Sequence, residues 1–207
     1  AGQLFNIPFY STHARGMTHY PKPHQYYQEM EKHYMSYHEI FKTLTEHTQN
    51  EGINWAKGRL QERLSGKIGV DIPYSTKTAF TSNVSSKPVV TKNNRIKILV
   101  TTHEFYDSPN CYGGLLFMDF YEWLMFLGKI SRKTNYDWYF KTHSDVSSLT
   151  EKVIKEIINE HSNFNFVQPE TSFHQLATEG IDYVLTCYGS VGHECPLLGM
   201  NVINAGN

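Results

Sequence analysis

The feature that most constrains the fold is an alternation of apolar and helical stretches along the second half of the chain. Apolar runs of strand length occupy residues 96–101, 138–142, 164–167, 183–186 and 202–203. Segments with helical spacing or capping residues lie between the first four of them, at 115–130, from 148 onward, and at 172–180. Strands that alternate with helices are typical of a parallel, doubly wound sheet. We therefore predict an α/β, Rossmann-like parallel sheet over residues 93–207.

Helix signals support this prediction. The helix at 115–130 is expected to bury Phe120, Trp123, Leu124 and Leu127. A capping box, Ser148-x-x-Glu151, predicts a helix that buries Val153, Ile154, Ile157 and Ile158. Ser172 is expected to open a short helix that Gly180 closes.

Residues 1–92 differ from this pattern. Residues 1–24 are rich in Pro, Gly, His and Tyr and indicate an irregular crossing segment. Helical spacing of apolar residues predicts two helices, at about 25–46 and 53–64. Polar clusters and two prolines over residues 67–93 predict a loop or linker. The chain begins with Ala1 and stops soon after a predicted strand, so we interpret it as a fragment, truncated at its C-terminal end.

Charge and composition narrow the function classes. Nineteen Lys and Arg residues stand against 20 Asp and Glu residues, a balance that does not favour nucleic acid as a partner. No apolar run reaches the roughly 18 residues that span a bilayer, and no leader is apparent, so we expect a cytoplasmic protein. The three cysteines form no CxxC pair, and the sequence contains no HExxH or DxD motif, so we expect no metal and no cofactor.

The terminal segment, residues 181–207, carries the most specific site signal. A predicted strand is followed by a turn of small residues and by a helix expected to open with Glu194 and to end at Gly199. Such a turn presents backbone N–H groups to a phosphate. We therefore select Ser190, Gly192 and Glu194 as binding residues. The alternative is a plain tight turn, with Glu194 favoured only by the helix dipole.

Polar side chains also follow the first two predicted strands, where parallel α/β sheets bind ligands. His103 and Asp107 are candidates for handling protons or sugar hydroxyls, although they can equally be turn residues that satisfy nearby backbone groups. Lys141 and His143 point the same way along a strand and suit a diphosphate, although a solvated lysine and a capping histidine are equally open. The lack of a GxGxxG motif argues against a nicotinamide site.

Three stretches resemble GT-B-fold glycosyltransferases of bacterial capsule and surface-polysaccharide biosynthesis, specifically their nucleotide-sugar-binding half. They are HEFYDSP with the downstream FMDFYEWL, YFKTHSD, and CYGSVGHECPLLGMNVINAG. Two positions depart from the family pattern: Ser144 stands where a proline often follows the lysine–histidine pair, and Met200-Asn201 replaces an expected Lys-Pro. The likeness covers residues 95–207, about half of the chain.

The resemblance implies a metal-independent transferase whose donor is a nucleotide-sugar and whose acceptor is a growing glycan. Glu194 would bind ribose or sugar hydroxyls, Ser190 and the Gly192 amide would hold phosphate, and Lys141 and His143 would steady the leaving nucleotide. An acceptor-binding domain of the same protein is an implied partner, so this chain alone is expected to be inactive. The family also suggests work at the inner face of the membrane. Two alternatives remain: a nucleotide-sugar epimerase of the same architecture, and a non-catalytic nucleotide-binding or scaffold module.

Overall fold

The structure, a computed structural model, describes residues 9–13, 16–20, 37–70, 75–81, 85–106, 116–143 and 146–206. The chain forms two compact units, Ala1–Trp55 and Ala56–Asn207, which are described separately here. The boundary between them falls inside one long helix, α4 (Glu46–Leu64).

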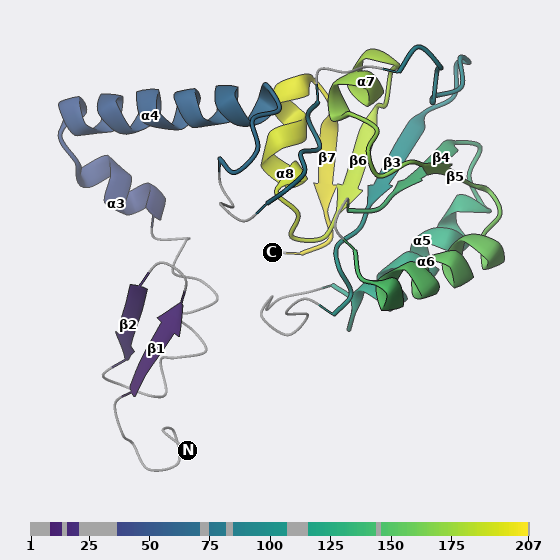
Figure 1. The fold of residues 1–207 in the computed structure, drawn as a ribbon, viewed down its shortest axis with the longest axis horizontal. Helices are drawn as coiled ribbons and strands as arrows, with labels where there is room; N and C mark the ends of the chain where they lie inside the picture. Colours follow the sequence, from purple (N-terminus) through teal and green to yellow (C-terminus); the bar gives the residue numbers. More distant parts are fainter. Residues whose placement is uncertain are drawn as a thin grey trace. The chain divides into compact units, whose positions relative to one another are not determined.

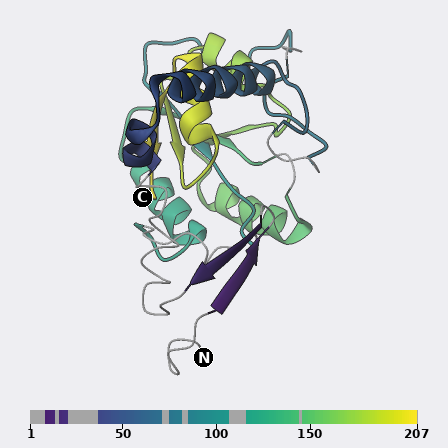
Figure 2. The same ribbon diagram turned by 90° about the vertical axis from the view of Figure 1, so that its left-hand side faces the viewer.

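The first unit contains a hairpin and a helical segment. Strands β1 (Phe9–His13) and β2 (Gly16–Tyr20) pair antiparallel and lie side by side in Figure 2. Helix α3 (Tyr37–Thr43) falls within the predicted helix at 25–46, while residues 21–36 lie outside the described residues. The Gln49 amide of α4 donates to the carbonyl oxygens of Phe41 and Leu44, which ties α3 to the start of α4.

Helix α4 is longer than the prediction of 53–64, and its apolar residues are not buried. Ile53 is 40% exposed, and none of the helix residues is fully buried. Gln49 near its start is half-buried, and so are four residues of its last turns, which belong to the second unit: Arg59, Leu60, Arg63 and Leu64. The predicted stop at Gly66 fits its left-handed backbone, with φ of +88°.

The second unit is built on a five-stranded sheet in which every neighbouring pair is parallel (Figure 1). Its strands are β3 (Lys97–Thr101), β4 (Asp137–Lys141), β5 (Phe164–Val167), β6 (Tyr183–Thr186) and β7 (Asn201–Asn204). The order in the sheet is β5-β4-β3-β6-β7. From β3 the chain winds outward in one direction and then returns to wind in the other. The predicted parallel, doubly wound α/β architecture is confirmed.

Helices cover both faces of this sheet. Helices α5 (Phe120–Ser131) and α6 (Ser148–Glu160) lie on one face, and α7 (Phe173–Thr178), α8 (Val191–Glu194) and the 3₁₀ helix η3 (Cys195–Leu198) lie on the other (Figure 1). Successive strand side chains point to opposite faces, so Ile98 and Val100 join the α5–α6 core while Leu99 joins the α7 core. The four apolar residues expected inside the helix at 115–130 are all buried.

The described parts of residues 67–93, the segment predicted as a loop or linker, are irregular, but two of their side chains pack in a hydrophobic core. Phe80 is fully buried and Val90 is 3% exposed, and both pack in the α7-side core with Leu99 and Tyr139. The sequence predicts a domain boundary between residues 92 and 93, whereas the two compact units of the structure divide between Trp55 and Ala56. The described parts of residues 75–92 therefore help to build the α/β unit.

Two predicted helix starts and one predicted helix cap are wrong. Helix α5 begins at Phe120 because the Asp119 carboxylate accepts a hydrogen bond from the N–H of Glu122 at 2.8 Å, which caps the helix. Helix α6 begins at Ser148 as predicted, but its cap is Ser147, which Glu104 holds by accepting hydrogen bonds from both the N–H and the hydroxyl of Ser147.

The second wrong start concerns the terminal unit, where Glu194 ends α8 instead of opening a helix. Ser190 already has helical backbone angles, so the helix begins three residues earlier than predicted. Pro196 lacks an N–H group and cannot continue the α-helical pattern, so the chain passes into η3. Gly199 ends η3 with φ of +83°, as predicted. Among the described helices, none has the length and hydropathy that crossing a membrane requires.

Candidate functional site

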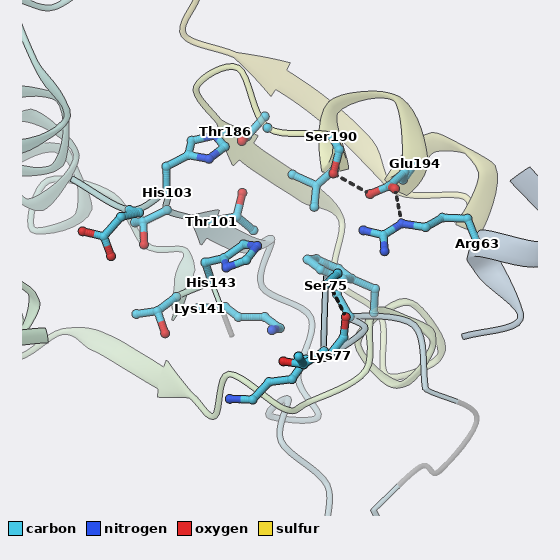
Figure 3. A pocket seen from close by; sticks show the side chains of 18 residues that line it. Arg63, Ser75, Lys77, Thr101, His103, Lys141, His143, Thr186, Ser190 and Glu194 are labelled. Carbon is cyan, nitrogen blue, oxygen red and sulfur yellow. Dashed lines mark hydrogen bonds and ion pairs between the residues drawn. The ribbon is translucent and has the colours of Figure 1, made fainter. Parts of the chain in front are cut away.

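A cavity of about 630 Å³ opens at the carboxyl ends of β3, β4 and β6 (Figure 3). The strand order reverses between β3 and β6, which is where doubly wound sheets bind ligands. Lining residues come from the ends of these strands, from the terminal turn, and from two earlier segments. They include Thr101, Thr102, His103, Glu104, Lys141, Thr142, His143, Thr186, Gly189, Ser190, Val191 and Glu194, together with Arg63, Ser75, Thr76, Lys77, Ala79 and Phe173.

Lys141 places a buried ammonium group in this cavity. The residue is 3% exposed, its Nζ donates to the carbonyl oxygen of Pro169, and it lies 5.3 Å from the centroid of the Phe173 ring. Burial lowers the pKa of Lys141 to about 8, against an opposing effect of Glu170. Within the described residues no carboxylate forms an ion pair with it. A buried cation with no directly paired carboxylate favours an anionic ligand.

The two predicted histidines line the same cavity. His103 is half-buried at the end of β3 and its ring lies 5.6 Å from that of Phe120, while His143 is exposed at the end of β4. Figure 3 shows His103, His143 and Lys141 extending from the ends of neighbouring strands. Asp107, the other predicted catalytic residue, lies outside the described residues.

Glu194 and Ser190 meet across the cavity from these groups, and Arg63 joins them. The Ser190 hydroxyl donates to Glu194 Oε2 at 3.0 Å, and Arg63 Nε donates to Glu194 Oε1 at 2.8 Å (Figure 3). Glu194 is 2% exposed. Glu194, which we expect to bind a sugar hydroxyl, is therefore a buried carboxylate held on both oxygens.

Backbone donors are present in the terminal turn, close to the position that we predicted. The Gly192 amide donates to the carbonyl oxygen of Gly189 at 2.8 Å and is used within the turn. In the part of the chain that the structure describes, no hydrogen bond uses the N–H groups of Gly189, Ser190 or Val191. All three residues line the cavity, so these N–H groups, not that of Gly192, are the available donors.

Close packing fixes the shape of the turn. A Cβ atom on Gly189 would lie 2.6 Å from Thr186 Oγ1 and 3.2 Å from His103 Nε2, so only glycine fits there without a shift. The preceding residue, Tyr188, has φ of +59°, an uncommon conformation for a residue with a side chain. Its N–H donates to Asn204 Oδ1 at 3.0 Å, which anchors the turn to the end of β7.

Glu104 lines the cavity, but most of its hydrogen bonds are made to residues at the start of α6. Its carboxylate accepts hydrogen bonds from the Ser147 N–H and hydroxyl and from the Thr150 hydroxyl. Burial raises the pKa of Glu104, but the hydrogen bonds from Thr150 and Ser147 outweigh it and lower the pKa below its ordinary value. These contacts of Glu104 are therefore structural ones, made to the backbone and hydroxyl groups at the start of α6.

Two cationic residues of the cavity were missed by sequence reasoning. Arg63 lies 131 residues from Glu194 in sequence, at the end of a helix with no motif, and Lys77 lies in a segment expected to be a linker. No local signal marks either residue.

The two described cysteines behave as packing residues. Cys187 and Cys195 are buried and free, and burial raises the pKa of their thiols to about 11 and 12. No group of three or more His, Cys, Asp or Glu side chains suited to a metal ion occurs among the described residues.

Comparisons with known proteins add no family to this description. No family model matches the sequence, and neither a curated protein nor a solved structure matches the chain.

Proposed function

We propose that the Ala56–Asn207 unit binds a nucleotide-sugar by its phosphate groups and is the donor-binding half of a glycosyltransferase. The observation that carries this proposal is the buried Lys141 ammonium, which lacks an ion-pair partner within the described residues and lines a cavity at the point where the strand order reverses. A cavity of about 630 Å³ lies within the usual range of roughly 300–1,000 Å³ for small-molecule sites.

Two kinds of donor line the cavity in which we place the phosphate. Lys141 supplies a charge, and the N–H groups of Gly189, Ser190 and Val191 supply neutral hydrogen bonds. Both are stronger in a partly buried cavity than in water, because the surrounding dielectric constant is lower. Glu194 lines the same cavity, and each of its oxygens, which already accepts one hydrogen bond, has a further lone pair for a sugar hydroxyl of the same ligand.

The step from nucleotide binding to sugar transfer rests on the resemblance of three sequence stretches to capsule and surface-polysaccharide transferases. In that reaction the bond between the anomeric carbon and the phosphate oxygen breaks, and an acceptor oxygen takes its place. The departing phosphate gains negative charge, which Lys141 and the turn amides stabilise. The acceptor hydroxyl loses its proton, and His103 and Asp107 are the candidates to receive it. The acceptor would be a growing surface glycan, held by an acceptor-binding domain.

Calorimetric titration of the chain with UDP, CMP, CDP and GDP tests the proposal. Binding of one nucleotide that weakens in Lys141→Met and in Glu194→Ala, but not in the surface variant Lys152→Met, supports it. Conversion of the matching nucleotide-sugar without any acceptor indicates an epimerase instead. Absence of binding by all four nucleotides contradicts the proposed function and favours a scaffold role.

A further inference from the structure

Arg63 connects the end of α4 to the carboxyl group of Glu194. Its Nε lies 2.8 Å from Glu194 Oε1, and the exposed fractions of the two side chains are 18% and 2%. The other oxygen, Oε2, accepts the hydroxyl of Ser190 at 3.0 Å. The carboxylate is thus held in one orientation beside the cavity.

Several contacts hold the Arg63 segment itself. The guanidinium lies 5.3 Å from the centroid of the buried Phe80 ring. The next residue, Leu64, accepts a hydrogen bond from His174 Nε2 on its carbonyl oxygen at 2.6 Å. Gly66 approaches the Phe80 carbonyl oxygen so closely that a Cβ would lie 2.7 Å from it. The guanidinium is therefore delivered by a fixed segment of backbone.

A carboxylate as deeply buried as Glu194 is costly to keep charged without a counter-charge. Without Arg63, the group is expected to take up a proton instead of remaining ionised. A neutral carboxyl group is a weaker acceptor for a ligand hydroxyl than a carboxylate is. The state of Glu194 therefore depends on its partner from α4.

We propose that Arg63 is a positioning residue that keeps the Glu194 carboxyl group ionised and turned toward the cavity. The part of this inference that concerns ligand binding rests on the proposed function. The part that concerns ionisation does not.

Other titratable groups surround this carboxylate. Cys195 follows it in sequence on η3, and the Cys195 thiol interacts with both Glu194 and Lys141. His193 precedes it on α8, and the imidazoles of His103 and His143 line the same cavity from β3 and β4. Of the cationic groups, Arg63 forms the ion pair that the structure describes at this carboxylate.

The first test needs no ligand and follows thermal unfolding of Arg63→Gln between about pH 5 and pH 8. In this variant the folded protein holds a proton on Glu194 that the unfolded chain has released, so stability falls as pH rises. The deficit in Tm relative to the wild type is therefore expected to grow toward pH 8. In Arg63→Gln/Glu194→Gln the titrating group is gone, and the deficit is expected to stay constant with pH. A constant deficit in the single variant overturns the proposal.

Arg63→Lys covers the case in which Arg63→Gln does not fold at any pH. Lysine keeps the positive charge but loses the planar guanidinium, so its Tm is expected to run parallel to the wild type across this pH range. A deficit in Arg63→Lys that grows with pH would show that the guanidinium itself is needed to keep Glu194 ionised. The same growth in Arg63→Lys/Glu194→Gln, in which residue 194 cannot titrate, overturns the proposal.

The second test is titration with UDP, CMP, CDP and GDP at several pH values. For a nucleotide that the wild type binds, we expect the ratio of the wild-type affinity to the Arg63→Gln affinity to grow about ten-fold as pH drops from 8 to 6. An affinity deficit that does not change with pH contradicts the ligand-binding part. If the wild type binds no nucleotide, the proposed function fails, while the unfolding comparison still decides the ionisation of Glu194.

Discussion

Lys141 Nζ lies 5.3 Å from the ring centroid of Phe173 and donates its hydrogen bond to a neutral carbonyl group, that of Pro169. Within the described residues, this buried ammonium has an aromatic face and a peptide oxygen as neighbours but no paired carboxylate. Such an arrangement costs stability in the free protein, and an anionic ligand reduces that cost. Binding and stability should therefore respond in opposite directions to the loss of this charge.

Replacing Lys141 with methionine should separate the two effects. A lysine pKa lowered from its ordinary value to about 8 means that the charged form is disfavoured in the folded state. Removing it should raise the free energy of unfolding by about 1–3 kcal/mol at pH 7. Nucleotide affinity should fall at least about ten-fold, because a charge-assisted hydrogen bond is lost. Urea unfolding and calorimetric titration measure the two quantities.

Lys152→Met is the matched control, because Lys152 is an exposed residue of α6 outside the cavity lining. It should change neither quantity appreciably. Equal nucleotide affinity in Lys141→Met and the wild type would show that this ammonium does not contact the ligand.

The pH dependence of nucleotide binding should follow Lys141. Because its pKa in the free protein is lowered to about 8, the ammonium is charged at pH 7 and loses its proton as pH rises above 8. Affinity should be steady between about pH 7 and 7.5 and fall about ten-fold by about pH 9.5. Lys141→Met should lack this decline. A wild-type affinity that stays constant through pH 9.5 would exclude Lys141 as the titrating contact.

The same shift affects stability with a defined sign. The folded-state pKa lies below that of the unfolded chain, so the unfolded chain binds more protons between about pH 8 and pH 10. The penalty from Lys141 is thus fully present below pH 8 and diminishes as pH rises toward the ordinary lysine value. The stability gain of Lys141→Met should shrink over the same range.

The two glycines of the terminal turn should respond differently to alanine. In Gly189→Ala the new Cβ meets Thr186 Oγ1 at 2.6 Å, so the turn must shift, and nucleotide affinity should fall about ten-fold or more. In Gly192→Ala the nearest atom is 3.8 Å away and the residue lies in α8, so affinity should be almost unchanged. Titration of both variants makes the comparison, and a larger loss in Gly192→Ala would contradict the assignment of the free amides.

Cys187 and Cys195 should resist alkylation in the folded protein. Both are buried, and burial raises the pKa of their thiols to about 11 and 12, so almost no reactive thiolate exists at pH 7.5. Iodoacetamide treatment followed by peptide mass spectrometry should find both unmodified in the native state and both modified in urea. Rapid native labelling of Cys195 would contradict the burial of this thiol.

Strands with strong local signals were predicted closely. The strands at Phe164–Val167 and Tyr183–Thr186 match their predicted ranges, and Ser172 caps α7 as expected. These strands combine β-branched or aromatic residues with clear turn residues beside them. The parallel sheet follows from the alternation of elements, which depends little on individual side chains.

The errors arise where a distant residue decides a local choice. Ser147 caps α6 because Glu104 holds it from the end of β3, 43 residues away in sequence. The ion pair of Glu194 with Arg63 was not predicted either, because nothing near Glu194 in sequence suggests Arg63. The cavity brings together Lys141, His143, Ser190 and Glu194, all predicted from strand ends and the turn, and leaves the amides of Gly189–Val191 as the available donors.

The burial of Phe80 and Val90 has a practical consequence for producing this protein in pieces. A recombinant fragment that begins at residue 93 would contain every strand of the parallel sheet, yet it would lack the side chains that cover Leu99 and Tyr139 on the α7 side. The uncovered apolar surface would favour aggregation. A fragment that begins near residue 56 retains that cover, and with it Arg63.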